Sequence, residues 1–280
     1  MLAGTLKSLA DQTLDRHEYE LLIIDNAGTD DARTVAETYG ARYVHERKIG
    51  LSHARNRAAA EANTDWIVYL DDDIIAPNDL LAKFHLRTQT DSYSVVGGNF
   101  THWFRVPPPG WLYKYYGDRM EPTPATAFTT VPNGSYLFGG VMAVRKSSLL
   151  EVGGFRPEFG MTGTTVATGE EDALQDSLRR AGHLIAYDPS ITIQHLVQPY
   201  KYSLSGQVRL AFAHGKAHQR IHRQAIGQKF SSIAFAWLRI STYSLPFNVA
   251  RWMLKPGYFW QHAYLDTVSK YAFECGRILA

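Results

Sequence analysis

The sequence predicts an α/β protein in which a sheet is flanked by helices, with a helical C-terminal extension. Between residues 21 and 86, short apolar runs alternate with helical stretches, and this rhythm is typical of βαβ units with parallel strands. One of these runs ends in three consecutive carboxylates at residues 71–73. Polar groups at the carboxyl end of a buried strand lie in the crevice where open α/β sheets bind ligands. The stretch from residue 201 to 280 instead predicts helices interrupted by prolines.

The composition is that of a globular protein with one large core or two modest ones, since 45% of the 280 residues are apolar. We expect one catalytic domain with an appendage. The formal net charge of +2, from 29 basic and 27 acidic residues, lacks the excess that nucleic-acid binding needs, so no nucleic-acid partner is expected. A single cysteine, Cys275, excludes an internal disulfide and fits a reducing compartment such as the cytoplasm.

The N-terminal stretch predicts an amphipathic helix through Leu2, Leu6 and Leu9. Its continuous apolar length is too short for a secretory signal, so no export is implied. The following elements alternate in type. Strands are predicted over residues 21–24, 42–44 and 66–70, with helices over 32–39 and 54–62.

The first and third of these strands end in acidic groups. Asp25 opens a tight turn, DNAGTD, into a helix that starts near Asp31, and Asp71, Asp72 and Asp73 follow the third strand. Acids on one sheet edge are explained by one shared ligand, and hard oxygen ligands suit Mg²⁺ or Mn²⁺ holding a diphosphate. Alternatively, Asp25 caps the helix, and the three carboxylates form a solvated turn before the next helix.

An inserted loop is predicted over residues 99–131. It contains a Pro-Pro-Pro-Gly run and an aromatic cluster made of Trp111, Tyr113, Tyr115 and Tyr116. Packing against the core is favoured for these rings over stacking on sugars or anchoring on a membrane surface. A strand is then predicted over 136–144, followed by a helix from 145 that ends at Gly153 and Gly154. Paired glycines at both ends of this segment indicate tight turns or close backbone approach.

A second acidic group opens the helix GEEDALQDSLRRAG, whose first turn carries Glu171 and Asp172. Acids at a helix start are explained either by the helix dipole or by a functional site. The Gly- and Thr-rich segment 161–165 just before them favours a site that closes over a substrate. Downstream, a strand predicted over 191–195 ends in His195, and a lone histidine is more often structural than a ligand.

The C-terminal third predicts a basic helix over 203–223 and further helices over 230–280, broken near Pro246 and Pro256. Charged residues cut its apolar runs well short of the roughly 20 residues that a membrane span requires. Aromatic and basic residues alternate on its faces at Trp237, Arg239, Arg251, Trp252, Lys255 and Trp260. Such faces permit peripheral docking on anionic lipid, but ordinary helix packing is favoured.

Five stretches in this order resemble the family-2 glycosyltransferases of GT-A fold. They are DNAGTDD, IGLSHARNRAAAEA, LDDD, GGVMAVRKSSLLEVGGF and GEEDALQDSLRRAG, and His195 follows them. The resemblance spans about residues 1–200 and implies a Rossmann-like mixed sheet flanked by helices. It further implies a nucleotide-binding half over 1–98 and an acceptor half over 99–200, with a helical C-terminal extension over 201–280.

The resemblance also implies roles for the residues that match these motifs. Asp25 would bind the nucleotide base, Asn26 would be a substrate-binding residue, and Arg55 would lie near the nucleotide. Asp71 would face the ribose, and Asp72 would lie close to the donor sugar or to Arg55. The metal ion, Mn²⁺ or Mg²⁺, would be held by Asp71, Asp73 and His195.

The helix GEEDALQDSLRRAG would carry the chemistry on the acceptor side. Asp172 matches the general base that deprotonates the acceptor hydroxyl, Glu171 would orient that acceptor, and Arg179 matches a basic substrate-binding position. The implied reaction moves a sugar from a UDP- or GDP-linked donor to a saccharide or lipid-linked acceptor, with inversion. We expect a role in polysaccharide or glycolipid synthesis at the cytoplasmic face of the membrane.

One departure from the family pattern concerns its opening strand, which usually ends in a P-x-Y-N type segment that holds the base. This chain begins at the helix after that strand, so an added upstream strand is expected to strengthen nucleotide binding. The alternative function is a degenerate, non-catalytic module that binds a nucleotide sugar or lipid. A haloacid-dehalogenase phosphatase is disfavoured because Ile74 and Ile75 follow the acids, and a nucleotidyltransferase because the first strand lacks a Gly-rich basic loop.

Overall fold

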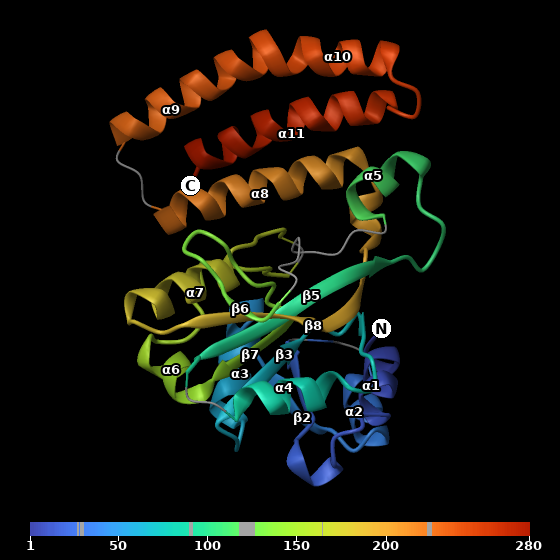
Figure 1. Cartoon of the computed structure of the whole chain (residues 1–280), viewed down its shortest axis with the longest axis vertical. Helices are drawn as coiled ribbons and strands as arrows, with labels where there is room; N and C mark the ends of the chain where they lie inside the picture. Colours follow the sequence, from blue (N-terminus) through green and yellow to red (C-terminus); the bar gives the residue numbers. More distant parts are fainter. Residues whose placement is uncertain (27, 29–30, 90–91, 118–126, 164, 223–225) are drawn as a thin grey trace. The chain divides into compact units, whose positions relative to one another are not determined.

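The computed structural model describes residues 1–26, 28, 31–89, 92–117, 127–163, 165–222 and 226–280 (Figure 1). Three expectations therefore fall partly outside the described residues. They concern Ala27, Thr29 and Asp30 in the first turn, residues 118–126 of the predicted loop, and Thr164 in the segment before the second acidic group.

The chain divides into two compact units. The sheet unit comprises Met1–Trp103, Asp118–Gly163 and Glu170–Leu196. The helical unit comprises Phe104–Gly117, Thr164–Gly169 and Val197–Ala280.

The sheet unit contains a parallel pair of strands, β1 (Leu22–Asn26) and β2 (Arg42–Glu46), and a larger mixed sheet. The larger sheet has the order β3-β7-β5-β8-β4, with β6 beside β8. Its strands are β3 (Trp66–Leu70), β4 (Ile74–Ile75), β5 (Val95–Trp103), β6 (Thr129–Thr130), β7 (Val141–Arg145) and β8 (Ile185–Leu196). The flanking helices are α1 (Leu2–Ala10), α2 (Ala32–Thr38), α3 (Leu51–Glu61), α4 (Leu80–Thr88), α6 (Lys146–Glu151) and α7 (Glu170–Arg180).

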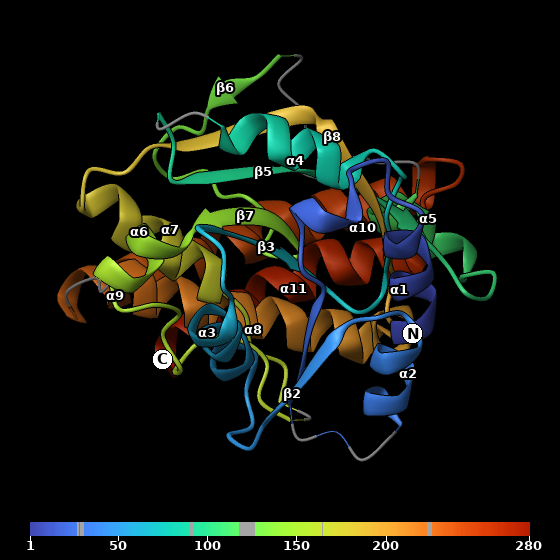
Figure 2. The same cartoon turned by 90° about the horizontal axis from the view of Figure 1, so that it is seen from below.

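The predicted α/β class with a mixed, helix-flanked sheet is confirmed, but the sequence rhythm alone predicted the wrong strand pairing. The β1-α2-β2 unit is parallel, as the rhythm indicates. The next strand, β3, pairs antiparallel with β7, and β7 also pairs antiparallel with β5 (Figure 2). An apolar run shows that a strand is buried but does not show which distant strand will insert beside it.

Two element boundaries differ from the prediction. Residues 99–103 belong to β5 rather than to a loop, because Asn99 is satisfied inside the sheet: its amide donates to the Tyr187 hydroxyl at 2.9 Å and accepts from the Thr192 hydroxyl at 2.8 Å. The strand predicted over 136–144 is shorter and covers only Val141–Arg145. Residues 139 and 140 form a turn, for a reason that lies in the site described below.

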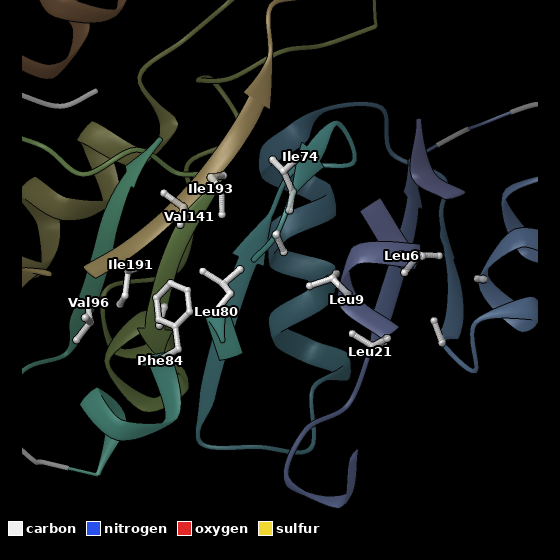
Figure 3. Close-up of a cluster of buried hydrophobic side chains, with 14 of the residues drawn as sticks. Leu6, Leu9, Leu21, Ile74, Leu80, Phe84, Val96, Val141, Ile191 and Ile193 are labelled. Carbon is white, nitrogen blue, oxygen red and sulfur yellow. The ribbon is translucent and has the colours of Figure 1, made fainter. Parts of the chain in front are cut away.

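The core of the sheet unit has two layers, one on each face of the sheet. Along β7, Val141 and Ala143 enter one layer while Met142 and Val144 enter the other, as strand geometry requires. Figure 3 shows the first layer, where Leu6 and Leu9 of α1 pack with residues of β4, α4 and β8. The amphipathic N-terminal helix predicted from Leu2, Leu6 and Leu9 is therefore confirmed, and it forms part of the core.

The helical unit contains α5 (Tyr113–Tyr116), α8 (Leu204–His222), α9 (Ile226–Arg239), α10 (Leu245–Leu254) and α11 (Trp260–Ile278). Helix α11 packs along α8 and against α10 and α9. The side chains of Lys114, Tyr115 and Tyr258 all donate to Asp266, which connects α5 to α11. Trp111 of the predicted aromatic cluster is buried, whereas Tyr113 is exposed.

The predicted interruption near Pro246 is confirmed, in the form of a π turn between two α-helices rather than a loop. A π turn, Ile240–Ser244, joins α9 to α10, and Pro246 lies in the first turn of α10, where its missing N–H leaves no intrahelical bond unmade. The break near Pro256 is confirmed, because α10 ends at Leu254 and Gly257 has a φ of 74°. Among the described residues, no helix is long and apolar enough to cross a bilayer.

Candidate active site

A cluster of two carboxylates and one imidazole lies at the carboxyl end of β3. One ligand atom from each of Asp71, Asp73 and His195 lies within 4.8 Å of the other two. The His195 Nε2 atom is 3.3 Å from Asp73 Oδ1 and 3.6 Å from Asp71 Oδ2. Two hard carboxylate oxygens with one imidazole nitrogen form a donor set that suits Mn²⁺ and also accommodates Mg²⁺. These residues therefore fit a divalent metal ion.

Backbone pairing brings the three residues together. Strand β4 follows the acids directly and pairs antiparallel with β8, so that Ile74 is opposite His195. The Leu196 N–H also donates to the Asp73 carbonyl at 3.1 Å. Both contacts are made by backbone atoms. They therefore hold His195 beside Asp73 without help from neighbouring side chains.

Helix α1 and the residues just after it hold this acidic segment through polar side chains. The Thr5 hydroxyl is 2.8 Å from the Asp72 carbonyl and 2.9 Å from the Ile74 carbonyl. Just beyond the C-terminal end of α1, the Gln12 amide donates to the Pro77 carbonyl at 2.8 Å and accepts from the Leu81 N–H at 2.9 Å. The helix therefore stabilises both the core and the backbone that carries the acids.

The pKa values of this cluster reflect mutual charge stabilisation. Burial acts to lower the pKa of His195, but hydrogen bonds to Asp71 and Asp73 outweigh it and raise the pKa to about 9. Burial acts to raise the pKa of Asp71, and the hydrogen bond to His195 and the charge of Arg55 bring it below its ordinary value. The imidazole is also flanked edge-on by the rings of Phe138 and Phe100.

A buried arginine connects this cluster to the second acidic group. The Arg55 guanidinium on α3 lies 3.1 Å from Glu170 Oε1 and 3.4 Å from Asp71 Oδ1. Burial acts to lower the pKa of Arg55, but the charges of Glu170 and Asp71 raise it overall. One guanidinium thus joins the end of β3 to the start of α7, so the two acidic motifs meet at this side chain.

Glycine is required where the chain passes over this arginine. A Cβ atom added to Gly139 would lie 2.7 Å from Arg55 Nη1, and one added to Gly140 would lie 2.4 Å from Asp71 Oδ2. Real Cβ atoms do not approach polar atoms this closely. The close approach that the paired glycines predict is confirmed, and it explains why the strand starts only at Val141.

The motif LSHARN does more than supply Arg55, because its helix also fixes the chain that leads to α7. The Asn56 amide forms two hydrogen bonds with the backbone of Phe155, at 2.7 and 2.8 Å. The Ser52 hydroxyl donates to the Phe159 carbonyl at 2.9 Å, and the Leu51 N–H donates to the Met161 carbonyl at 2.9 Å. Helix α3 therefore positions the segment that precedes the second acidic group.

Glu171 and Asp172 lie in the first turn of α7, as predicted. Burial and the negative charges of Glu170 and Asp176 raise the pKa of Asp172 to about 6. Burial and the neighbouring charges of Glu170 and Asp172 raise the pKa of Glu171 well above its ordinary range. Two adjacent carboxyl groups with raised pKa values are suited to acid–base chemistry.

The last turns of α7 hold the chain before the paired glycines. The Gln175 amide exchanges two hydrogen bonds with the Leu137 backbone, at 2.8 and 2.9 Å. Arg179 donates to the Ser135 carbonyl at 2.6 Å and lies over the Tyr136 ring. These contacts make Arg179 a residue that holds residues 135–137, and its substrate-binding role stays a prediction.

Asp25, predicted to bind the base, and Asn26, predicted to bind substrate, lie at the end of β1. Asp25 accepts from the Tyr43 hydroxyl at 2.6 Å and from the Gly28 N–H at 2.8 Å. The Asn26 amide donates to the Lys48 carbonyl at 2.7 Å and accepts from the Gly50 N–H at 2.7 Å. The two Asn26 bonds fix the loop between β2 and α3. The ligand that Asp25 is expected to share with the acids after β3 stays a prediction.

Two features of the site went unpredicted. The side chain of Asp72 is exposed while Asp71 and Asp73 turn inward, and strand alternation could have indicated this division. The sequence pattern does not single out Glu170, yet this residue is buried and paired with Arg55. A run of three acids at a helix start does not show which of them turns inward. The ion pair between Glu170 and Arg55, which lie 115 positions apart, therefore could not be predicted from the local sequence.

Residues 1–153 match the family described as glycosyl transferase family 2. Over 243 residues the chain is 25% identical to the succinoglycan biosynthesis protein ExoM of Rhizobium meliloti (strain 1021), a match that covers 84% of this chain and 74% of that protein. It is also 29% identical over 126 residues to the uncharacterized glycosyltransferase YfnE of Bacillus subtilis (strain 168). That match covers 43% of this chain and 30% of the relative.

Two solved structures have a similar fold. The mannosyltransferase PcManGT from Pyrobaculum calidifontis, in complex with GDP-Man and Mn²⁺, has a TM-score of 0.62 at 16% identity, covering 96% of this chain and 81% of that one. S. aureus TarS 1-349, in complex with UDP, has a TM-score of 0.52 at 13% identity, covering 98% and 86%.

Proposed function

The chain belongs to glycosyl transferase family 2 and is a glycosyltransferase, and from this premise we propose a specific reaction. The protein transfers a sugar from a nucleoside-diphosphate sugar to a hydroxyl group of a saccharide or lipid-linked acceptor, with inversion at the anomeric carbon. The observation that carries the proposal is the buried Arg55. Its guanidinium joins Asp71 of the metal-binding cluster to Glu170, the residue just before Glu171 and Asp172.

On this proposal, Asp71, Asp73 and His195 hold Mn²⁺ or Mg²⁺, and the ion when bound neutralises the charge of the leaving diphosphate. Asp172 accepts the proton of the acceptor hydroxyl while that oxygen bonds to the anomeric carbon and the bond to the diphosphate breaks. A pKa of about 6 leaves Asp172 ionised at neutral pH while making it more basic than an ordinary aspartate. A single displacement requires no covalent intermediate and inverts the carbon.

Glu171 has a different proposed part in the reaction. Its pKa is raised well above the ordinary value by partial burial and by the negative charges of Glu170 and Asp172. In its protonated form, which the raised pKa favours, Glu171 can donate a hydrogen bond to the acceptor, whereas an ionised Asp172 can only accept.

The similar solved structures support a nucleoside-diphosphate sugar as donor, but they do not select its nucleotide base. The mannosyltransferase structure was solved with GDP-Man and Mn²⁺, and the TarS structure with UDP. We therefore propose a GDP- or UDP-linked donor. The similarity to a succinoglycan biosynthesis protein supports a role in polysaccharide synthesis, with a glycolipid product as the other possibility within the same chemistry.

The test is release of nucleoside diphosphate from a panel of UDP- and GDP-sugars, with and without Mn²⁺, together with calorimetric binding of the free nucleotides. We expect release from one donor that depends on Mn²⁺. Nucleotide binding without release, in a folded protein supplied with saccharide and lipid-linked acceptors, would favour the non-catalytic binding module and contradict the proposal.

A further inference from the structure

Helices α9 and α10 have an inverted arrangement of apolar and polar side chains. Leu254 is 81% exposed and Phe235 is 68% exposed, which is unusual for large apolar residues on a folded helix. The other exposed large apolar residues of this stretch are Phe230, Trp237, Leu238, Tyr243, Leu245, Phe247, Val249, Trp252 and Met253. We call this set, with Phe235 and Leu254, the apolar face.

The inward seam of the same helices is half polar. Its buried residues recur at helical spacing and are Ile233, Ile240, Ser244 and Asn248. The Asn248 amide donates to the Thr267 hydroxyl at 3.0 Å, and Lys270 donates to the Ser244 hydroxyl at 3.1 Å. Near the other end, Arg277 donates to the Ser232 hydroxyl at 2.8 Å. Polar contacts with α11 therefore help to hold α9 and α10, and most of the large apolar side chains of these two helices remain outside.

The charge of this region has one sign. From residue 189 to residue 265 the chain contains no aspartate or glutamate. The same stretch contains the basic residues Lys201, Arg209, Lys216, Arg220, Arg223, Lys229, Arg239, Arg251 and Lys255. Two of them, Arg239 and Lys255, are exposed at the C-terminal ends of α9 and α10, within the range of the apolar face.

We propose that the apolar face docks on the surface of an anionic lipid bilayer, with α9 and α10 lying in the plane of the interface. Together the two helices and the π turn extend for about 40 Å at 1.5 Å per residue. Exposed aromatic and aliphatic side chains next to lysine and arginine, with no acidic residue, are the composition of helices that lie at such interfaces. Each basic residue adds attraction to anionic head groups.

A second copy of the chain fits this surface poorly. A symmetric dimer interface pairs a surface patch with itself, so Arg239 and Lys255 would face other basic residues with no acid from residues 189–265 to neutralise them. A bilayer rich in anionic lipid supplies the missing negative charge. The proposal adds a partner to the proposed function but does not depend on it, since lipid binding is measured without donor or acceptor.

The experiment is sedimentation of the full chain with vesicles of phosphatidylcholine alone or mixed with phosphatidylglycerol, at low and high salt. We expect binding to the mixed vesicles that weakens with salt. The double variant Trp252→Glu/Leu254→Glu should lower the partition coefficient at least ~10-fold, because two exposed apolar anchors are lost and negative charge is added. Its matched control is Leu86→Glu, at an exposed apolar position of α4, which should bind like the parent.

A second pair of variants tests charge alone. Arg239→Gln/Lys255→Gln should weaken binding to the mixed vesicles by roughly 5-fold per charge, while Lys7→Gln/Arg105→Gln removes two exposed charges elsewhere and should have little effect. Thermal unfolding checks that each variant is folded. Absence of vesicle binding by the parent, or equal binding by the Trp252→Glu/Leu254→Glu variant, would overturn the proposal. So would a dimer, seen by analytical ultracentrifugation, that this variant dissociates.

Discussion

In most proteins charged side chains are exposed and large apolar side chains are buried. The Arg55 site and the apolar face each break one half of this rule. In the sheet unit, Arg55 and Glu170 are charged yet buried, and each has a partner of opposite charge. In the helical unit, Trp252 and Leu254 are apolar yet exposed. Burying charge costs free energy unless it is paired, and exposing large apolar groups costs the burial that they would gain. The ion pair compensates the first departure within the protein, whereas nothing in the described part of the chain compensates the second, which therefore points to an apolar ligand.

The largest expected effect is on turnover, at the base proposed in the first region. Asp172→Asn should lower kcat by about 10²- to 10⁴-fold, because the amide cannot accept the hydroxyl proton. Nucleotide affinity, measured by calorimetry, should stay near that of the parent. Asp176→Asn, one turn along α7, is the matched control, and comparable losses in the two variants would remove the special role of Asp172.

The next effect is on stability. Arg55→Met should lower the free energy of unfolding by about 3–5 kcal/mol, because Glu170 is left buried without its cation. Arg57→Met on the same helix breaks only an exposed ion pair with Glu61 and should cost less than ~1 kcal/mol. Denaturant unfolding of both variants measures the difference. Equal losses would mean that the buried pair is no more stabilising than a surface pair.

An intermediate effect is expected on the pH profile. The base must be ionised, and its pKa is raised to about 6, so kcat should fall by up to about tenfold per pH unit as the pH drops below 6. Because the charge of Arg179 lowers the pKa of Asp172, Arg179→Gln should move this acidic limb to higher pH. The exposed neighbour Arg180→Gln should leave the limb in place, and a limb unmoved in both variants would argue against Asp172 as the titrating group.

The smallest effect is predicted for the apolar face. Leu254→Glu should change the free energy of unfolding by less than ~0.5 kcal/mol in the absence of lipid, since the side chain makes little contact with the protein. Leu178→Ala in the core should cost about 2–5 kcal/mol. A loss of several kcal/mol for Leu254→Glu would show that this residue is packed in solution, and it would remove the contrast between the two regions.

Much of the first region could be predicted from the sequence because its signals are local. A strand that ends in LDDD places polar groups at its carboxyl end, and a helix that opens with Glu171 and Asp172 places them in its first turn. The pairing of β3 with β7 and of Arg55 with Glu170 could not be predicted in this way. These contacts join residues far apart in sequence, and neither partner carries a local signal that selects the other.

The second region shows the opposite limit. Composition alone identified aromatic and basic residues in α9 and α10, but ordinary packing was the favoured interpretation, because an apolar residue on a helix usually faces a core. The structure overturns that interpretation for Trp252, which is exposed. The decisive feature is the polar seam with α11 through Ser244 and Asn248, and a sequence does not show which face of a helix its neighbour will cover.

The metal-binding cluster is the central claim, and Mn²⁺ binding measured by calorimetry tests it most directly. Three proteins suffice: the parent, Asp73→Asn, and Asp79→Asn as a matched control in the same acidic segment, where the carboxylate pairs with Lys83 instead. We predict one Mn²⁺ site in the parent and in Asp79→Asn, and its loss in Asp73→Asn. Equal Mn²⁺ affinity in all three proteins would contradict the assignment of Asp71, Asp73 and His195 as the metal ligands.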